Sequence, residues 1–214
     1  MSYALALAGL AFANMLGIIS PGPAFLMVSR AASGRDLKTA VGLAAGVAVA
    51  ATSWAAMACF GIALLMARAA ALYGAIQLAG GAYLIWLGIA AWRASRTGAR
   101  PPAEAAAMPP APARTGIARA VLTGALLNLG NPKMVIFFTS IFVALLPPQA
   151  PLWLRLTVVA IVAVQEISWY TAVAVVFSRP SVQAAYRRAS TWIERVLGTV
   201  LIGLGLRILV GVRV

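Results

Sequence analysis

Long uncharged apolar runs constrain this chain more than any other feature of its sequence. Several of them exceed the roughly 18–20 residues that a helix needs to cross a bilayer. Of the 214 residues, 63% are hydrophobic and only 10% are charged. A soluble domain has no use for so much apolar surface. We therefore expect an all-α polytopic membrane protein, with the lipid bilayer as its surroundings.

Six membrane spans account for the apolar runs. We place them at residues 3–28, 39–67, 71–92, 118–146, 152–177 and 191–210. The sixth is the weakest, because only 11 residues separate Arg195 from Arg207, and an interfacial helix is its alternative. Residues 93–117, rich in Pro, Ala and Arg, predict a flexible, solvent-exposed linker. The chain then divides into residues 1–92, this linker and residues 118–214.

Basic residues gather on one side of the predicted spans. Of the 17 Lys and Arg residues, 12 lie in loops after the first, third and fifth spans. They are Arg30, Arg35, Lys38, Arg93, Arg96, Arg100, Arg114, Arg119, Arg179, Arg187, Arg188 and Arg195. Because cytoplasmic loops carry an excess of basic residues, we expect a cytoplasmic linker and both termini outside the cytoplasm. Loop charges of this kind explain the net charge of +13 without a nucleic-acid partner.

Two proline-containing breaks interrupt the first and fourth spans. The first is Ser20, Pro21, Gly22 and Pro23, and the second is Asn131, Pro132 and Lys133. A proline inside a helix removes a backbone donor and clashes with the preceding turn, so each break should open its helix. In a bilayer, an opened helix is tolerated where it is buried in protein or lines a wet cavity.

The breaks are therefore candidate binding sites. Helix ends at a break expose N–H groups, which favour anions, and carbonyl groups, which favour cations. An amino acid carries one group of each charge, so the two breaks together are predicted to bind such a zwitterion. The alternative is a pair of structural kinks without a ligand.

A repeated motif relates the two halves of the chain. The pattern G-x-x-L-I-x-L-G occurs at residues 81–88 and again at 198–205, an offset of 117, while Pro21 and Pro132 are offset by 111. We interpret this as one three-span unit used twice. Because three is an odd number, the two copies insert with opposite orientations. Inverted repeats with paired broken helices, here the first and fourth, are typical of secondary transporters that work by alternating access.

Lys133 and Glu166 are the only charged residues placed deep in the predicted spans. Such a charge costs about 2.5–3.5 kcal/mol even on insertion scales and is a functional candidate. Lys133 is predicted to hold a substrate carboxylate. Glu166 is predicted to take the substrate amino group or a coupling proton, since the chain has no histidine. A structural ion pair between the two is the alternative.

Two further residues are assigned to the predicted binding site. Asn128 flanks the second break. Trp169 follows Glu166 by three residues, on the same helical face, and is expected to shape a pocket. Gly42 and Gly46 form a small-xxx-small pair, which either packs within the monomer or builds a homodimer. Cys59, the single cysteine, is interpreted as a buried, inert thiol.

Several other protein classes find no support in the sequence. It contains no phosphate-binding loop, zinc-ligand spacing, nucleotide fingerprint or Ser/His/Asp set, so we expect no cofactor and no use of ATP. A cation exporter, an intramembrane enzyme and a passive scaffold are the alternatives to a transporter of small organic substrates. For the cation exporter the chain offers few carboxylate, thiol or imidazole ligands.

Four motifs occur in the order and spacing of a known family. The first break ends the first span, and the Gly34-Arg35 turn precedes Gly42 and Gly46. The third span reads Leu-Ala-Gly-Gly-Ala-Tyr-Leu at residues 78–84 and continues to Leu-Gly at 87–88. The fourth reads Asn-Leu-Gly-Asn-Pro-Lys at 128–133 and continues to Phe-Phe at 137–138. Over nearly its whole length the chain thus resembles the lysine exporter (LysE-type) family, which includes homoserine/threonine exporters.

The resemblance implies a bacterial inner-membrane exporter of amino acids or related small metabolites, driven by the proton gradient. The family often has an acidic residue before a Trp where Glu166 stands. One position departs from the family pattern: the residue after Pro-Gly-Pro is commonly Asp there, and here it is Ala24. This departure implies a substrate that differs from those of other members.

Overall fold

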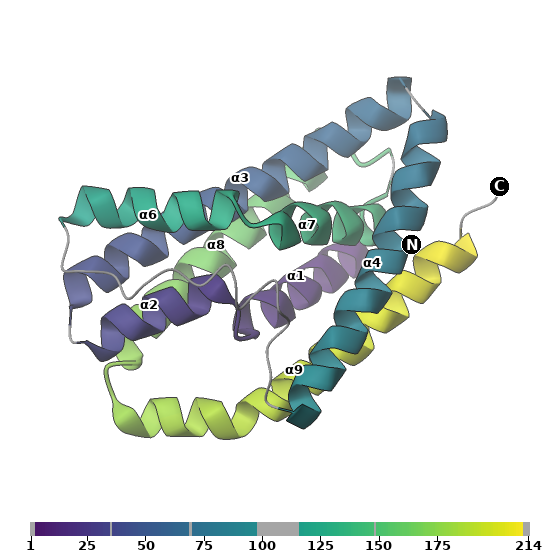
Figure 1. Ribbon diagram of the computed structural model, residues 1–214. Helices are drawn as coiled ribbons and strands as arrows, with labels where there is room; N and C mark the ends of the chain where they lie inside the picture. Colours follow the sequence, from purple (N-terminus) through teal and green to yellow (C-terminus); the bar gives the residue numbers. More distant parts are fainter. Residues whose placement is uncertain (1–2, 35, 69, 98–115, 148, 212–214) are drawn as a thin grey trace.

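All of the regular structure is helical within the described part of the chain, as predicted. The structure, a computed structural model, describes residues 3–34, 36–68, 70–97, 116–147 and 149–211. Figure 1 shows the arrangement of these helices. They are α1 (Tyr3–Ile19), α2 (Pro23–Ser33), α3 (Leu37–Arg68), α4 (Ala70–Thr97), α6 (Ile117–Leu129), α7 (Pro132–Leu145), α8 (Leu152–Val176) and α9 (Pro180–Gly211).

Between three and five membrane spans can be recognised among the described helices. Leu37–Gly61 of α3, Gly74–Arg96 of α4 and the whole of α8 are each long and apolar enough to cross a bilayer. Two bent pairs pass the same test when each is taken as one broken span. α1 and α2 meet at 53°, and α6 and the part of α7 from Lys133 onward meet at 62°. α9 is not among the candidates, because Glu194, Arg195 and Arg207 interrupt its apolar stretches.

The two helix breaks share a local design. Pro21 has no N–H for the carbonyl of Gly17 in the preceding turn, so α1 ends there. Gly22, with extended backbone (φ −94°, ψ 178°), then caps α2, whose first residue is Pro23. In the second break the Asn131 side chain accepts a hydrogen bond from the backbone N–H of Lys133 at 3.0 Å.

A proline is well tolerated at the first position of a helix, where its missing N–H would have no partner. Pro23 begins α2 and Pro132 begins α7. The prolines that occupy equivalent places are therefore Pro23 and Pro132. Pro21 and Pro132, which the repeat pairs at an offset of 111, occupy different local positions: Pro21 lies between two helices, and Pro132 begins one.

Glycines of the repeated motif let α4 and α9 approach closely. A Cβ atom added to Gly88 would lie 2.6 Å from the carbonyl oxygen of Gly198, and one added to Gly198 would lie 2.6 Å from that of Gly88. Gly81 and Gly205 face each other in the same reciprocal way, at 3.1 and 2.5 Å. The two helices consequently lie side by side (Figure 1).

Gly42 and Gly46 of α3 pack against α6 of the same chain. A Cβ atom at Gly42 would lie 2.7 Å from the Ala120 side chain, and one at Gly46 would overlap the backbone of Val121. Of the two uses expected for this pair, the structure therefore shows packing within the monomer.

The linker boundary differs slightly from the prediction. α4 continues to Thr97, so residues 93–97 at the start of the expected linker are helical. Residues 98–115 lie outside the described part of the chain.

Arg155, which the sequence places near the start of a span, is buried. Its guanidinium donates hydrogen bonds to the carbonyl oxygens of Ala150 at 2.9 Å and Cys59 at 2.7 Å.

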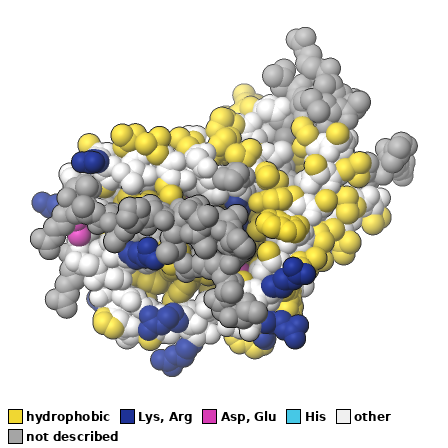
Figure 2. Space-filling model, viewed as in Figure 1, with side chains coloured by type: hydrophobic (Ala, Val, Ile, Leu, Met, Phe, Trp, Pro, Cys, Tyr) yellow, Lys and Arg dark blue, Asp and Glu magenta, His cyan; other side chains and the backbone are white. Residues whose placement is uncertain are grey.

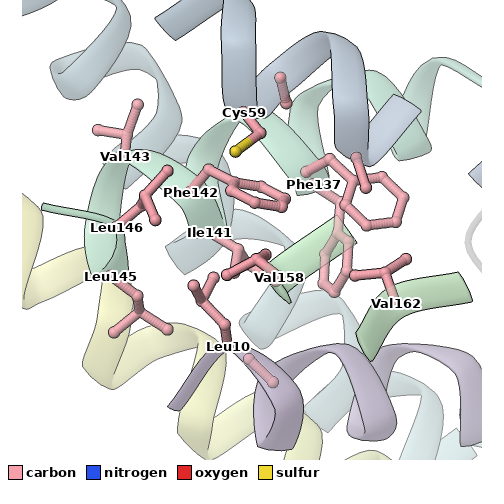
Figure 3. Close-up of a cluster of buried hydrophobic side chains, with 14 of the residues drawn as sticks. Leu10, Cys59, Phe137, Ile141, Phe142, Val143, Leu145, Leu146, Val158 and Val162 are labelled. Atoms are coloured by element: carbon pink, nitrogen blue, oxygen red, sulfur yellow. The ribbon is translucent and has the colours of Figure 1, made fainter. Parts of the chain in front are cut away.

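An apolar core lies among α1, α3, α4, α7, α8 and α9. Figure 3 shows Leu10, Phe137, Phe142, Val158 and Val162 converging in it, with Cys59 of α3 at its edge. Cys59 is fully buried, in agreement with the interpretation as a buried thiol.

Candidate functional site

Two adjoining cavities lie beside the helix breaks. The larger, here called the wide cavity, has a volume of about 650 Å³. The smaller, the inner cavity, has a volume of about 40 Å³, which leaves room for roughly one or two water molecules. Ser20, Leu87, Lys133 and Leu197 line both cavities. The two spaces therefore share a boundary.

The inner cavity brings together most of the site residues predicted from the sequence. The described residues of that set that line it are Ser20, Gly22, Pro23, Asn128, Asn131, Lys133 and Glu166. Both breaks thus face one space, although they are more than a hundred residues apart in the chain. Ala24, at the position that departs from the family pattern, lines it as well.

Two predicted residues with described side chains, Pro21 and Trp169, do not line the inner cavity. Pro21 lines the wide cavity. Pro132 is the first residue of α7, at the second break. Trp169 is not among the described residues that line either cavity, and it packs half-buried against a separate apolar cluster that contains Phe25 and Val47. Tyr170, the next residue along α8, lines the inner cavity instead.

Glu166 is completely buried at the wall of the inner cavity. Neither of its carboxylate oxygens has a hydrogen-bond partner among the described residues. Lys133 lines the same cavity, yet no hydrogen bond joins the two side chains. The structure therefore does not contain the ion pair that was the structural alternative for these residues.

Asn14 is an inner-cavity residue that sequence reasoning did not assign to the site. It lies on α1, is 3% exposed, and donates a hydrogen bond from Nδ2 to Oε1 of Gln165 at 2.9 Å. Gln165 in turn donates from Nε2 to the carbonyl of Ala11 at 3.0 Å. Its place fewer than two helical turns before the first break was the one available signal.

The first half of α9 also contributes Tyr186, which falls in a predicted loop, and Glu194, at the start of the predicted sixth span. The Tyr186 hydroxyl donates to the carbonyl oxygen of Ile19 at 2.7 Å, where α1 has ended and no helical N–H is close. The Ser20 hydroxyl donates to Oε1 of Glu194 at 3.2 Å. Tyr186 and Glu194 both line the wide cavity. α9 therefore holds the first break in position.

Metal ligands do not gather in the described part of the chain. It contains no group of three or more His, Cys, Asp or Glu side chains that could hold a metal ion. The polar residues that line the inner cavity instead carry amides, hydroxyl groups, one carboxylate and one ammonium group. This mixture is suited to a small polar organic molecule with both charges.

Helices of spanning length and two bent helix pairs, whose breaks line one cavity with amide, carboxyl and ammonium groups, are typical of membrane transporters. The chain belongs to the LysE type translocator family, whose model matches residues 15–211. This membership confirms the resemblance seen in the sequence motifs. It also shows that the protein is a transporter and not an enzyme, with a small-molecule substrate and lipid as its surroundings.

Named relatives cover almost the whole chain. A threonine efflux protein of Salmonella typhi is 31% identical over 200 residues, which is 94% of this chain and 95% of the relative. A threonine efflux protein of Escherichia coli K12 is 31% identical over 204 residues, with the same coverage. The uncharacterized membrane protein YahN of Escherichia coli K12 is 31% identical over 91% of this chain and 85% of its own. No solved structure matches the chain.

Proposed function

We propose that this protein exports amino acids or related small metabolites across the bacterial inner membrane. In this proposal it is a proton-coupled secondary transporter that works by alternating access. The observation that carries the proposal is that both helix breaks line one inner cavity together with Lys133 and Glu166. The relatives named threonine efflux proteins support the substrate class.

The substrate carboxylate is assigned to the side of the inner cavity formed by the breaks. Gly22, Pro23 and Ala24 begin α2, and Asn131 and Lys133 lie at the start of α7, so two helix N-termini line this space. N-termini carry a partial positive charge and unpaired N–H groups, which favour an anion. The ammonium group of Lys133 adds a full positive charge at the same wall.

The predicted inverted repeat is part of the proposal. In it, α9 supplies the sixth span, and residues 1–92 and 118–214 are two copies of one three-span unit. The reciprocal packing of Gly88 with Gly198, and of Gly81 with Gly205, supports a two-fold relation between α4 and α9. The proline at the start of both α2 and α7 supports the same relation between the breaks.

The distribution of basic residues supports the proposed orientation. Five basic residues lie close to helix termini. Arg30, Arg93 and Arg179 are near the ends of α2, α4 and α8, and Lys38 and Arg119 are near the starts of α3 and α6. Figure 2 shows Lys and Arg side chains over the left and lower parts of the visible face and few at its upper right. With this basic end in the cytoplasm, both termini lie outside it.

Alternating access requires a cavity that opens to one side at a time. The wide cavity includes Arg96 and Arg187 among its lining residues, so it lies toward the basic end. Phe137, which lines the inner cavity, belongs to the apolar core together with Phe138 and Phe142. Phe137 packs tightly there, because a Cβ atom at Gly17 would lie 2.5 Å from its ring. In this proposal the wide cavity is the opening toward the cytoplasm.

Glu166 is assigned the coupling proton. It is the one carboxylate among the described residues that line the inner cavity, and it is fully buried there. A carboxylate in this position can take up a proton when the cavity faces one solution and release it when the cavity faces the other. Exchange of one substrate molecule for another needs no net proton movement and therefore does not depend on this step.

Transport by the purified full-length protein in proteoliposomes tests the proposal. We expect efflux of at least one of the twenty amino acids or homoserine, accelerated by a pH gradient. Glu166→Gln should abolish the acceleration, while exchange continues at substrate concentrations high enough to offset weaker binding. Glu104→Gln, which removes a negative charge from the sequence of the predicted linker, is the control. Absence of transport for every compound would refute the export proposal, and a fully gradient-driven Glu166→Gln would remove Glu166 as the proton carrier.

A further inference from the structure

Three almost fully buried side chains at the inner cavity keep acceptor oxygens without partners. Asn14 is 3% exposed, Asn128 is 1% exposed and Glu166 is 0% exposed, and all three line this cavity. Oδ1 of Asn14, Oδ1 of Asn128 and both carboxylate oxygens of Glu166 accept no hydrogen bond from the described residues. Buried polar atoms of this kind are rare in folded proteins and require an explanation.

The hydrogen bonds around the two amides determine which atoms are left over. A backbone carbonyl can only accept, so Asn128 must turn its NH₂ group toward the Val47 carbonyl, which it meets at 3.0 Å. Gln165 must likewise give its NH₂ group to the carbonyl of Ala11. Its own oxygen then faces Asn14, which must donate to it. Both asparagines therefore use their donors on protein atoms and retain free oxygens.

The lining of the inner cavity consequently combines excess acceptors with one carboxyl group, whose ionised form a positively charged ligand would favour. Lys133 lines the same space but donates no hydrogen bond to any of these four oxygens. A ligand group that satisfies them must be rich in donors and positively charged. A primary ammonium group has three N–H donors, no acceptor and one positive charge.

We propose that Asn14, Asn128 and Glu166 form the subsite that binds the ammonium group of the substrate. This assignment rests on the proposed export function and extends it, because it names Asn14 and Asn128 as determinants of specificity. The inner cavity, at about 40 Å³, is large enough for an ammonium group but not for a whole amino acid. The substrate carboxylate then lies beside Lys133, at the boundary between the two cavities, and the side chain extends into the wide cavity.

Substrate analogues test this subsite in exchange assays with the full-length protein in proteoliposomes. The probe is radiolabelled L-threonine, or the amino acid that the export panel transports best. One competitor replaces its ammonium group by a hydroxyl group, as in 2,3-dihydroxybutanoate for threonine. The other lacks the carboxylate, as in 1-amino-2-propanol. We expect the amine to compete and the hydroxy acid to fail, and equal competition by the hydroxy acid would overturn the proposal.

Variants of the two asparagines provide the second test. Asn14→Leu and Asn128→Leu should each raise the apparent KM for exchange by roughly tenfold, since each removes a hydrogen bond to a charged group. Ser140→Ala is the matched control. Ser140 is 1% exposed and its hydroxyl also has no partner, but it lies outside the linings of both cavities. An equal KM in all three variants would assign the asparagines to structure alone.

A binding measurement separates this inference from the export proposal. Methylammonium chloride should raise the Tm of the detergent-solubilised wild-type protein above that in potassium chloride, and both asparagine variants should lose this shift. If no amino acid is transported but the shift is present, the export proposal fails and the ammonium subsite stands. If sodium chloride produces the shift and methylammonium does not, the subsite binds a metal cation and the proposal is wrong. If neither cation shifts the Tm, the ammonium-subsite proposal is also wrong.

Discussion

The Ser20 hydroxyl donates a hydrogen bond to the Glu194 carboxylate at 3.2 Å, which joins the first helix break to α9. The two residues are 174 positions apart in the chain. Ser20 lines both cavities, and Glu194 lines the wide one. The bond therefore stands at the boundary that a substrate must pass between the wide cavity and the inner cavity.

Removal of this hydrogen bond should make the inner cavity more accessible. In a Cys59→Ala background, Ala24→Cys places a thiol in the inner cavity, where a small water-soluble thiol reagent measures access. A hydrogen bond to a charged group contributes about 1.5–3 kcal/mol, so adding Ser20→Ala should speed the reaction by roughly tenfold or more.

The matched control for Ser20→Ala is Ser29→Ala. Ser29 also lines the wide cavity, but its hydroxyl donates only to the Leu26 carbonyl of its own helix, at 3.1 Å. This variant should leave the reaction rate unchanged. Equal rates in the Ser20 and Ser29 variants would show that the contact with Glu194 does not limit access.

The breaks could be predicted because proline has a fixed physical consequence. A proline in an apolar run interrupts one helix and is favoured as the first residue of the next. Pro23 and Pro132 each begin a helix in this way. Only the repeat predicts that the two breaks share one site. The mutual contact of Gly88 and Gly198 depends on tertiary packing, although the motif marked both glycines.

The first half of α9 could not be recognised from the sequence. Between Arg179 and Arg195 the chain is too charged for a span and shows no long apolar run, so the sequence predicts a loop for most of this segment. Tyr186 and Glu194 there contact Ile19 and Ser20, partners more than 160 positions away. Such contacts leave no local signal.

Helical geometry explains why Tyr170, rather than the predicted Trp169, lines the inner cavity. At 3.6 residues per turn, a residue three positions on is rotated by about 60° from the starting direction, and one four positions on by about 40°. From Glu166 these residues are Trp169 and Tyr170. The inner cavity is narrow enough for this difference to matter, and Tyr170 lines it.

The glycine contact between α4 and α9 should be intolerant of even a methyl group. In Gly88→Ala the new Cβ would lie 2.6 Å from the Gly198 carbonyl oxygen, so the helices must separate. We expect a loss of about 1–3 kcal/mol of stability, measured as a lower Tm in detergent. Gly203→Ala, on α9 where no atom lies within 4 Å of the added Cβ, is the control.

The control should change stability in the opposite direction. Alanine favours the helix over glycine by about 0.5–1 kcal/mol, so Gly203→Ala should have an unchanged or higher Tm. A Gly88→Ala protein as stable as Gly203→Ala would show that α4 and α9 are not held at this distance.

Lys133 should act on the carboxylate of the substrate. Lys133→Met is expected to raise the KM for an exported amino acid by roughly tenfold, because a charged partner is lost. Competition by the matching amine without a carboxylate should be unaffected, and Lys133→Arg should restore part of the affinity. An equal loss for the amino acid and the amine would place Lys133 outside carboxylate binding.

Arg155 should stabilise the fold without taking part in transport. Its guanidinium donates to the carbonyls of Ala150 and Cys59, each contact worth about 1.5–3 kcal/mol. Arg155→Met should therefore lower the Tm markedly. Arg119→Met, which removes an exposed charge at the start of α6, should have a Tm close to that of the wild type. Similar Tm values for the two variants would exclude this role.

The central claim is that the substrate binds with its ammonium group in the inner cavity, between the two breaks. Its most direct test is protection of the Ala24→Cys thiol by an exported amino acid, in the Cys59→Ala background. Ala94→Cys, in the wide cavity only, is the reference position. The account predicts that saturating amino acid slows the reaction of the Ala24→Cys thiol far more than that of the reference. Equal reaction rates at Ala24→Cys with and without the amino acid would contradict it.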